Sequence, residues 1–233
     1  MAYLLYNEKT VTRDLKMAET NENTGIDFYT WATPNGRKVS IMLEETGLSY
    51  RVIPIDITSG DQHKPEFLKI SPNNKIPAIV DHENGISLME SGGILMYLAK
   101  KTGQLMSESG PDYWHEMEWL MFQMGGVGPM LGQTHHFVKF NPGKSTYAEE
   151  RYSAENRRLY GVLDKRLQGR DFICDKYSIV DIATWPWISR FEWQQMDLNE
   201  FPQLKDWYLR IAERPAVQRG YAVPQDLPVP IPD

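Results

Sequence analysis

Short apolar runs alternate with amphipathic stretches in the N-terminal part of the chain. Their spacing predicts strands at 26–31, 50–55, 77–81 and 86–88, and helices at 37–46, 65–70 and 93–101. Gly47 and Gly103 end two of these helices, and Glu83-Asn84-Gly85 turns the chain between the last two strands. A right-handed βαβ crossover followed by an antiparallel hairpin forms a mixed four-stranded sheet. We therefore predict a thioredoxin-like domain over residues 26–103.

The pattern changes after a linker at 107–111, beyond which no strand pattern appears. Apolar residues at helical spacing predict helices at 112–124, 147–167, 178–193 and 201–214. We expect the glycine-rich run 125–129 to interrupt the first of these, and Pro215 to close the last. The fold class is therefore α/β plus all-α. The chain divides into four parts. They are an N-terminal extension at 1–25 that is partly ordered at best, the thioredoxin-like domain at 26–103, an all-helical domain at 112–220 and a proline-rich tail at 221–233.

Composition and charge argue against several kinds of partner. The chain has 233 residues, 41% of them hydrophobic, which is enough for two modest domains. A net charge of −6 argues against an electrostatic grip on nucleic acid or an anionic membrane. No apolar stretch reaches transmembrane length, and the N-terminus lacks the apolar segment of a signal peptide. One cysteine, Cys174, excludes an internal disulfide framework and a cysteine-rich metal site. We expect a cytoplasmic protein with no bound metal.

The stretch SPNNKIPAIV at 71–80 is the most informative in the chain. Pro77 opens an apolar run, a position that suits a strand start and a cis peptide bond. A cis bond would turn the backbone N–H and C=O of Ile76 outward, free to pair with the main chain of a ligand. Farther on, Ser91 is predicted to cap a helix whose start attracts a carboxylate, and Glu90 supplies the opposite charge. This pair suits the ammonium and carboxylate of a γ-glutamyl group, as in glutathione; the alternative is a strand, a turn and a capped helix without a ligand.

A second candidate for chemistry lies where the first strand meets the first helix. The amides at a helix start favour a thiolate. Thr33 can donate its hydroxyl proton to such a sulfur, and Asn35 its side-chain amide. The alternative is a turn in which Thr33 and Asn35 satisfy only the local backbone.

Several other polar residues are interpreted as structural. The run Ser178-Ile179-Val180-Asp181 is a capping box that fixes where a buried helix begins. His135 and His136 are adjacent on a helix and diverge in direction, so we expect a pocket wall or a satisfied core position instead of a joint metal site. Cys174 lies among acidic neighbours that disfavour its thiolate. The charged run 149–158 is mostly a solvated helix face, from which one arginine turned toward the domain cleft could bind a carboxylate.

Together these motifs resemble the glutathione S-transferases, and more narrowly the bacterial Nu-class branch with the yeast prion-type nitrogen regulator. The resemblance runs from about Ile26 to about Pro215. The matching motifs are Thr33-Pro34-Asn35-Gly36, the run from Pro65 to Ile79, Glu90-Ser91-Gly92, the run from Gly125 to Gln133, and the run from Tyr177 to Ile182. The resemblance implies a thioredoxin-like domain, a helical domain and a homodimer. It also implies glutathione as substrate, with room for two glutathiones or the oxidised dimer.

The same resemblance implies roles for individual residues. Thr33 and Asn35 would lie near the sulfur, Ile76 before cis-Pro77 would pair with the cysteinyl backbone, Glu90 and Ser91 would hold the γ-glutamyl group, Gln62 would contact the glycyl end, and Arg151 would contact the second glutathione. The tyrosine that activates the thiol in well-known classes has no clear counterpart, because its nearest equivalent position is Trp31, with Tyr29 two residues earlier. The expected function is therefore a glutathione-dependent reductase of small disulfides that uses no protein cysteine. The alternatives are a transferase that conjugates electrophiles and a non-catalytic glutathione-binding regulator.

Overall fold

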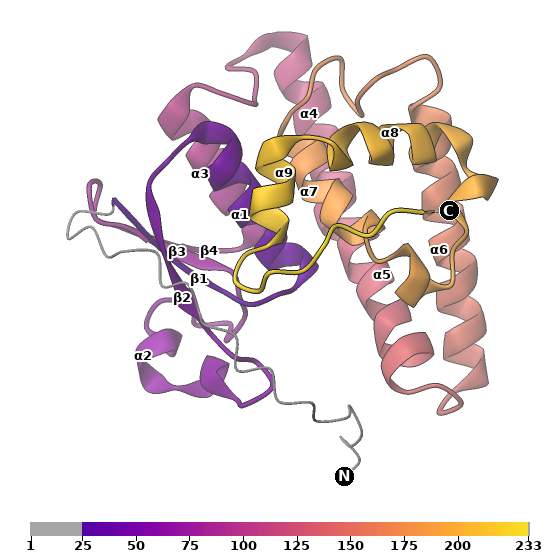
Figure 1. The fold of residues 1–233 in the computed structure, drawn as a ribbon, viewed down its shortest axis with the longest axis horizontal. Helices are drawn as coiled ribbons and strands as arrows, with labels where there is room; N and C mark the ends of the chain where they lie inside the picture. The colour runs from indigo at the N-terminus through magenta and orange to yellow at the C-terminus, as the bar shows by residue number, and fades with distance from the viewer. Residues whose placement is uncertain (1–24, 233) are drawn as a thin grey trace.

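The computed structural model describes residues 25–232, so the predicted N-terminal extension lies outside the described residues except for Gly25. In chain order the elements are β1 (Ile26–Thr30), α1 (Pro34–Thr46), β2 (Tyr50–Pro54), α2 (Pro65–Leu68), β3 (Ala78–Asp81), β4 (Ile86–Met89), α3 (Ser91–Thr102), α4 (Gly110–Phe122), α5 (Gly128–Thr134), α6 (Thr146–Arg166), α7 (Ile179–Ile188), α8 (Pro202–Ala212) and α9 (Pro215–Tyr221). Figure 1 shows the sheet on one side of the molecule and the C-terminal helices on the other. The predicted thioredoxin-like and all-helical parts are therefore confirmed.

The sheet has the mixed topology that the sequence predicts. Its strand order is β2-β1-β3-β4, with β1 parallel to β2 and β3 antiparallel to both of its neighbours. Alternate side chains of β1 enter different packing layers. Phe28 is fully buried in the main core with residues of α1 and α3, whereas Tyr29 packs beside Phe67 of α2. The sheet thus has α1 and α3 on one face and α2 on the other.

Helix α1 begins three residues earlier than predicted, and this shift moves the candidate chemistry into its first turn. Thr33 caps the helix, accepting a hydrogen bond from the Gly36 amide at 3.2 Å. Pro34 occupies the first helical position, where its missing N–H costs nothing. A Cβ on Gly36 would lie 2.4 Å from Oγ1 of Thr30, so only glycine lets the helix start this close to the end of β1.

The predicted interruption at 125–129 is wrong. A helical run extends from Gly110 to Phe140, with π turns at Gln123–Val127 and His135–Phe140. Gly128 and Gly132 sit inside this run because the indole of Trp187 packs on both of them. Added Cβ atoms at these glycines would lie 3.3 Å from indole atoms. Gly128 and Gly132 therefore accommodate a large neighbour, and the chain stays helical through the run, with π in place of α hydrogen bonding at Gln123–Val127.

Two further helix boundaries differ from the prediction. The helix predicted to reach 193 ends at Ile188, and a 3-10 turn follows at Phe191–Gln194. Helix α8 ends at Ala212, and Pro215 begins a further helix, α9, because proline is favoured at a first helical position. The predicted capping box is confirmed, with Ser178 and Asp181 bonded reciprocally to the backbone at the start of α7.

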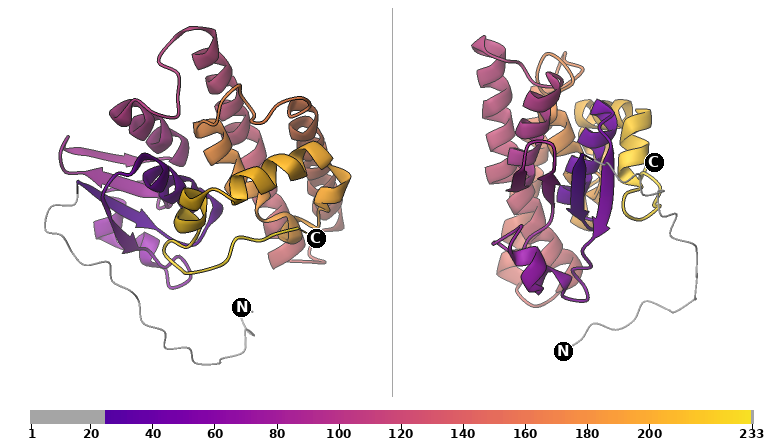
Figure 2. Two further views of the ribbon diagram at one scale, coloured as in Figure 1. Left: turned by 45° about the horizontal axis from the view of Figure 1, so that its top comes forward. Right: turned by 90° about the vertical axis from the view of Figure 1, so that its left-hand side faces the viewer.

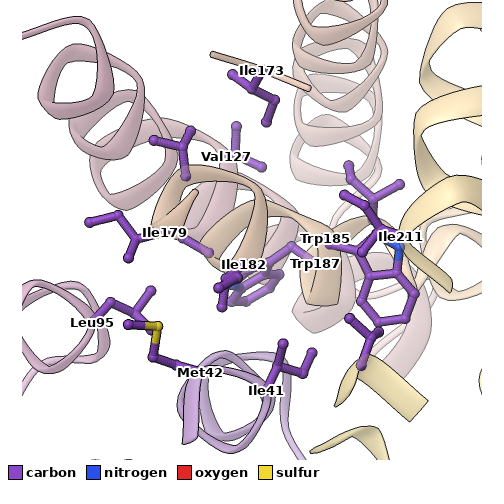
Figure 3. Packing of buried hydrophobic residues seen from close by; sticks show 14 of the residues in the cluster. Ile41, Met42, Leu95, Val127, Ile173, Ile179, Ile182, Trp185, Trp187 and Ile211 are labelled. Carbon is purple, nitrogen blue, oxygen red and sulfur yellow. The ribbon is translucent and has the colours of Figure 1, made fainter. Parts of the chain in front are cut away.

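One hydrophobic core joins the two parts of the molecule. Figure 3 shows Ile41 and Met42 of α1 facing Ile182 of α7, with Trp185 and Trp187 beside them. Helix α9 packs beside α1 in the views of Figures 1 and 2, and a Cβ on Gly220 would lie 2.6 Å from the Ile41 Cα. This close packing fixes α1 between the sheet and the C-terminal helices. Among residues 25–232, no helix is both long and apolar enough to cross a membrane.

Candidate functional site

A pocket of about 250 Å³ lies where the start of α1, the approach to β3 and the start of α3 meet the π turn after α4. The lining side chains from the predicted set are Asn35, Ile76, Pro77, Glu90 and Ser91. Met124 closes the pocket from the helical part of the chain. Motifs that are widely spaced in the sequence therefore meet in one cavity.

The helix start places Asn35 in the pocket wall, and the helical part of the chain orients its amide. The Oδ1 atom of Asn35 accepts a hydrogen bond of 3.0 Å from the indole N–H of Trp187. An indole N–H can only donate, so the accepting atom must be the oxygen, and the amide NH₂ of Asn35 faces away from Trp187. The ring of His135 stacks on Trp187 with centroids 5.7 Å apart and supports the indole. The geometry leaves Asn35 as a hydrogen-bond donor.

Thr33 lies next to the pocket but is not among its lining residues. Its hydroxyl oxygen accepts the Gly36 amide, which leaves the hydroxyl proton free to donate. The predicted pair Thr33 and Asn35 is thus brought to one helix start, with the asparagine nearer to the cavity.

The Ile76–Pro77 peptide bond is cis, as the sequence predicts, and both residues line the pocket. Ser71 supports the preceding loop, because its hydroxyl donates a hydrogen bond of 2.8 Å to the backbone oxygen of Lys75. The backbone next to β3 therefore forms one wall of the cavity.

At the start of α3, Glu90 takes the cap position, with a φ of 72° that a non-glycine residue rarely adopts. Such a conformation costs about 1–3 kcal/mol and is found most often at functional sites. The prediction that Ser91 caps this helix is wrong. Ser91 is its first residue, and its buried hydroxyl lies 3.4 Å from Nζ of Lys38, so it serves a side-chain contact and not the backbone cap.

Sequence reasoning missed Lys38. Its side chain is 1% exposed, and its Nζ also lies 2.8 Å from Oε1 of Gln123 and 3.4 Å from the sulfur of Met124. Burial lowers the pKa of Lys38 to about 7, against the opposing influence of Glu90. The available signal was its position, because a residue three places after Asn35 shares that face of the helix.

Two predicted ligand residues lie outside this pocket. Gln62 is half-buried, and its Nε2 donates to the backbone oxygen of Ile57 at 3.3 Å. Arg151 is exposed on α6 and lines a separate, larger pocket of about 630 Å³. Its neighbour there, Arg158, is paired with Glu155 at 2.7 Å, whereas Arg151 makes no direct ion pair with any residue in the described part of the chain.

The groups that could support other chemistry are poorly placed for it. Burial is the main cause that raises the pKa of Tyr29, whose ring packs beside Phe67 on the α2 face of the sheet. Burial also raises the pKa of the Cys174 thiol to about 12, and Asp181 and Glu116 add to the shift. Asp175, the acidic residue next to Cys174 in the sequence, contributes least among the named groups that affect this thiol.

The two histidines diverge as predicted. His136 is exposed, while His135 is buried and shares a hydrogen bond of 3.0 Å with Gln194. Burial lowers the pKa of His135 to about 4, so this ring is neutral at physiological pH. His135 is therefore a satisfied core histidine that supports Trp187.

Comparison with known proteins agrees with this geometry. The model of the glutathione S-transferase N-terminal domain matches residues 25–100, and the model of the C-terminal domain matches residues 127–215. The chain is 50% identical over 197 residues to the disulfide-bond oxidoreductase YfcG of Escherichia coli. The alignment covers 82% of this chain and 92% of YfcG.

Two solved structures are also similar. A glutathione transferase from Pseudomonas putida, with one glutathione disulfide bound per subunit, has a TM-score of 0.83 and 41% identity over 88% of this chain and 94% of its own. One from Burkholderia graminis, with two glutathione molecules per subunit, has a TM-score of 0.82 and 43% identity over 88% of this chain and 91% of its own. This chain belongs to the glutathione S-transferase family, in the Nu-class branch that also contains the URE2 proteins.

Proposed function

We propose that this protein is a glutathione-dependent reductase of small disulfides, and that the reductant is bound glutathione and not a protein thiol. The thiolate of the bound glutathione attacks one sulfur of the disulfide, forms a mixed disulfide and expels the other sulfur as a thiolate. A second glutathione thiolate then attacks the glutathione sulfur of the mixed disulfide, which yields oxidised glutathione and the second product thiol. The resemblance to YfcG and the ligands of the two related structures support this sequence of steps.

The observation that carries the proposal is the orientation of Asn35. Because Trp187 occupies its oxygen, the amide NH₂ can donate to a sulfur held in the pocket. A donor that favours the thiolate over the thiol lowers its pKa, and each pKa unit corresponds to about 1.4 kcal/mol. The free hydroxyl proton of Thr33 and the amides at the start of α1 add to this effect.

The remaining pocket residues suit the rest of the tripeptide. In this arrangement Glu90 binds the ammonium of the γ-glutamyl group, and Ser91 with the start of α3 binds its carboxylate. The backbone of Ile76 pairs with the cysteinyl residue. Arg151, which has no direct ion-pair partner in the part of the chain that the structure describes, binds a carboxylate of the second glutathione, and Gln62 contacts the glycyl end.

The conjugating alternative that depends on a tyrosine is not favoured, because Tyr29 packs on the opposite face of the sheet from α1.

We also place the protein in the cytoplasm, where glutathione is kept reduced, and propose that it is a homodimer. Trp114 and Met121 support the dimer, because they lie seven residues apart on α4 and are 67% and 51% exposed.

The test of the proposed function separates turnover from binding. Thr33→Val and Asn35→Ala should lower the turnover of a small disulfide more than they weaken glutathione binding, because their donors act on the sulfur alone. Ser91→Ala should do the reverse, weakening binding measured by calorimetry. Tyr29→Phe is the control for a tyrosine mechanism. Loss of activity in Tyr29→Phe with full activity in Asn35→Ala would refute the assignment.

A further inference from the structure

Lys38 is a buried lysine that has no carboxylate in contact with its side-chain nitrogen. Its three close partners are Oε1 of Gln123, Oγ of Ser91 and the sulfur of Met124, all of them neutral. Within residues 25–232 no acidic side chain lies within ion-pair distance of Lys38. A charged group in such a position is unfavourable unless an anion completes its surroundings.

The position of Lys38 shows where that anion would bind. Two of its three partners, Ser91 and Met124, line the pocket, and Ser91 begins α3. A carboxylate at this helix start would accept hydrogen bonds from the α3 amides and from the Ser91 hydroxyl. Because Lys38 donates to the same hydroxyl oxygen, its charge lies directly behind the group that meets the carboxylate.

We infer that Lys38 is a glutathione-binding residue, and that it supplies the counter-charge for the γ-glutamyl carboxylate through Ser91. This inference rests on the proposed function, since it assigns a role within the glutathione site. Lys38 does not line the pocket itself and reaches it through Ser91 and Met124.

The direction of the pH dependence follows from the surroundings of Lys38. Its pKa of about 7 in the ligand-free protein is set by burial, and Glu90 is the charged side chain that acts against this shift. The partners from α3 and from the π turn are uncharged. A bound carboxylate stabilises the ammonium form and raises this pKa. Glutathione affinity should therefore fall as the pH rises above about 7, by up to about tenfold per pH unit.

The experiment is calorimetric titration of the full chain with S-methylglutathione, which carries no titrating thiol. Measurement at about pH 8 in two buffers of different ionisation enthalpy gives the number of protons taken up. The wild type should take up more than about half a proton per ligand at this pH, and close to none at about pH 6. A second ligand, the analogue without the γ-glutamyl α-carboxylate, should bind without proton uptake.

Substitutions of Lys38 test its role in glutathione binding. Lys38→Met should abolish the proton uptake and weaken S-methylglutathione binding at about pH 6 at least about tenfold, while binding of the decarboxylated analogue changes little. Lys38→Gln, which keeps a hydrogen-bonding side chain, provides a second uncharged variant if Lys38→Met does not fold. Lys75→Met is the matched control, since Lys75 is an exposed lysine that lines the same pocket, and this variant should keep the proton uptake.

The outcomes distinguish this inference from the proposed function. Tight binding of S-methylglutathione by the wild type and equally tight binding by Lys38→Met would overturn the role of Lys38 and leave the glutathione site intact. Equal weakening of both ligands in Lys38→Met would mean that Lys38 only supports the fold of the pocket. No binding of S-methylglutathione by the wild type would refute the glutathione site itself.

Discussion

Replacing Trp187 with phenylalanine should lower turnover without abolishing glutathione binding. The change removes the indole N–H that donates to Oδ1 of Asn35 at 3.0 Å, and the asparagine amide can then rotate. A neutral, partly buried hydrogen bond contributes about 0.5–1.5 kcal/mol. If the whole of this free energy stabilises the amide orientation that donates to the thiolate, its loss should lower kcat about 2- to 12-fold. The assay is steady-state reduction of a small dialkyl disulfide, with the oxidised glutathione measured by a coupled NADPH-dependent reductase.

Trp185→Phe is a matched control for this prediction. Trp185 lies on the same helix, and its indole N–H donates to the backbone oxygen of Tyr208 at 3.0 Å, away from the pocket. Its replacement should cost stability but leave kcat unchanged. In an Asn35→Ala background, Trp187→Phe should have no further effect on kcat, because the two residues act through one hydrogen bond. Full additivity of the two substitutions, or unchanged kcat in Trp187→Phe, would refute the orienting role of Trp187.

Three further substitutions test other parts of the account. Glu90→Gly should leave thermal stability unchanged or raised, because relief of the positive φ, about 1–3 kcal/mol, offsets the added chain entropy of about 1 kcal/mol. Its glutathione affinity should fall at least about tenfold. A loss of thermal stability together with the loss of affinity would contradict the assignment of Glu90 as a ligand residue. Arg151→Ala should raise the concentration of glutathione needed for the second step, whereas Arg158→Ala, which removes a residue already paired in the same pocket, should not. Gly220→Ala should destabilise the protein by about 1–3 kcal/mol in urea unfolding, because its Cβ would lie 2.6 Å from the backbone of α1, while Gly161→Ala, with open space around it, should not.

The sheet and most helices could be predicted because their information is local. Apolar spacing, glycine caps and the capping box at Ser178 each act within a few residues. The failure at 125–129 has a physical cause that is not local. Glycine is a weak helix former in isolation, yet Gly128 and Gly132 face Trp187, which lies more than fifty residues away in the chain. Helix α8 ends shortly before Pro215, as predicted, but the sequence did not reveal that Pro215 also begins α9, since the same residue can end one helix and begin the next.

The candidate site could likewise be predicted only where local motifs mark its residues. Asn35, Ile76, Pro77, Glu90 and Ser91 were all identified from local motifs, and the structure places them around one pocket. The resemblance to a family added Gln62 and Arg151, which the structure places elsewhere.

Two groups that act on this pocket were not found from the sequence. Trp187 orients Asn35 across 152 residues of sequence, and no pattern links the two. Lys38 follows an arginine in an amphipathic helix, where a lysine ordinarily faces solvent. Its burial depends on neighbours from α3 and from the π turn, which only the tertiary structure brings together.

The central claim is that the attacking sulfur belongs to bound glutathione, and the cysteine-free protein tests it most directly. Cys174 is the one cysteine of the chain; it is 5% exposed, and burial raises the pKa of its thiol to about 12, so it stays protonated at neutral pH. The Cys174→Ala variant should therefore retain most of the wild-type rate in the steady-state reduction of a small disulfide by glutathione. A fall to the uncatalysed rate, with the fold intact by circular dichroism, would show that the protein's own sulfur is the nucleophile.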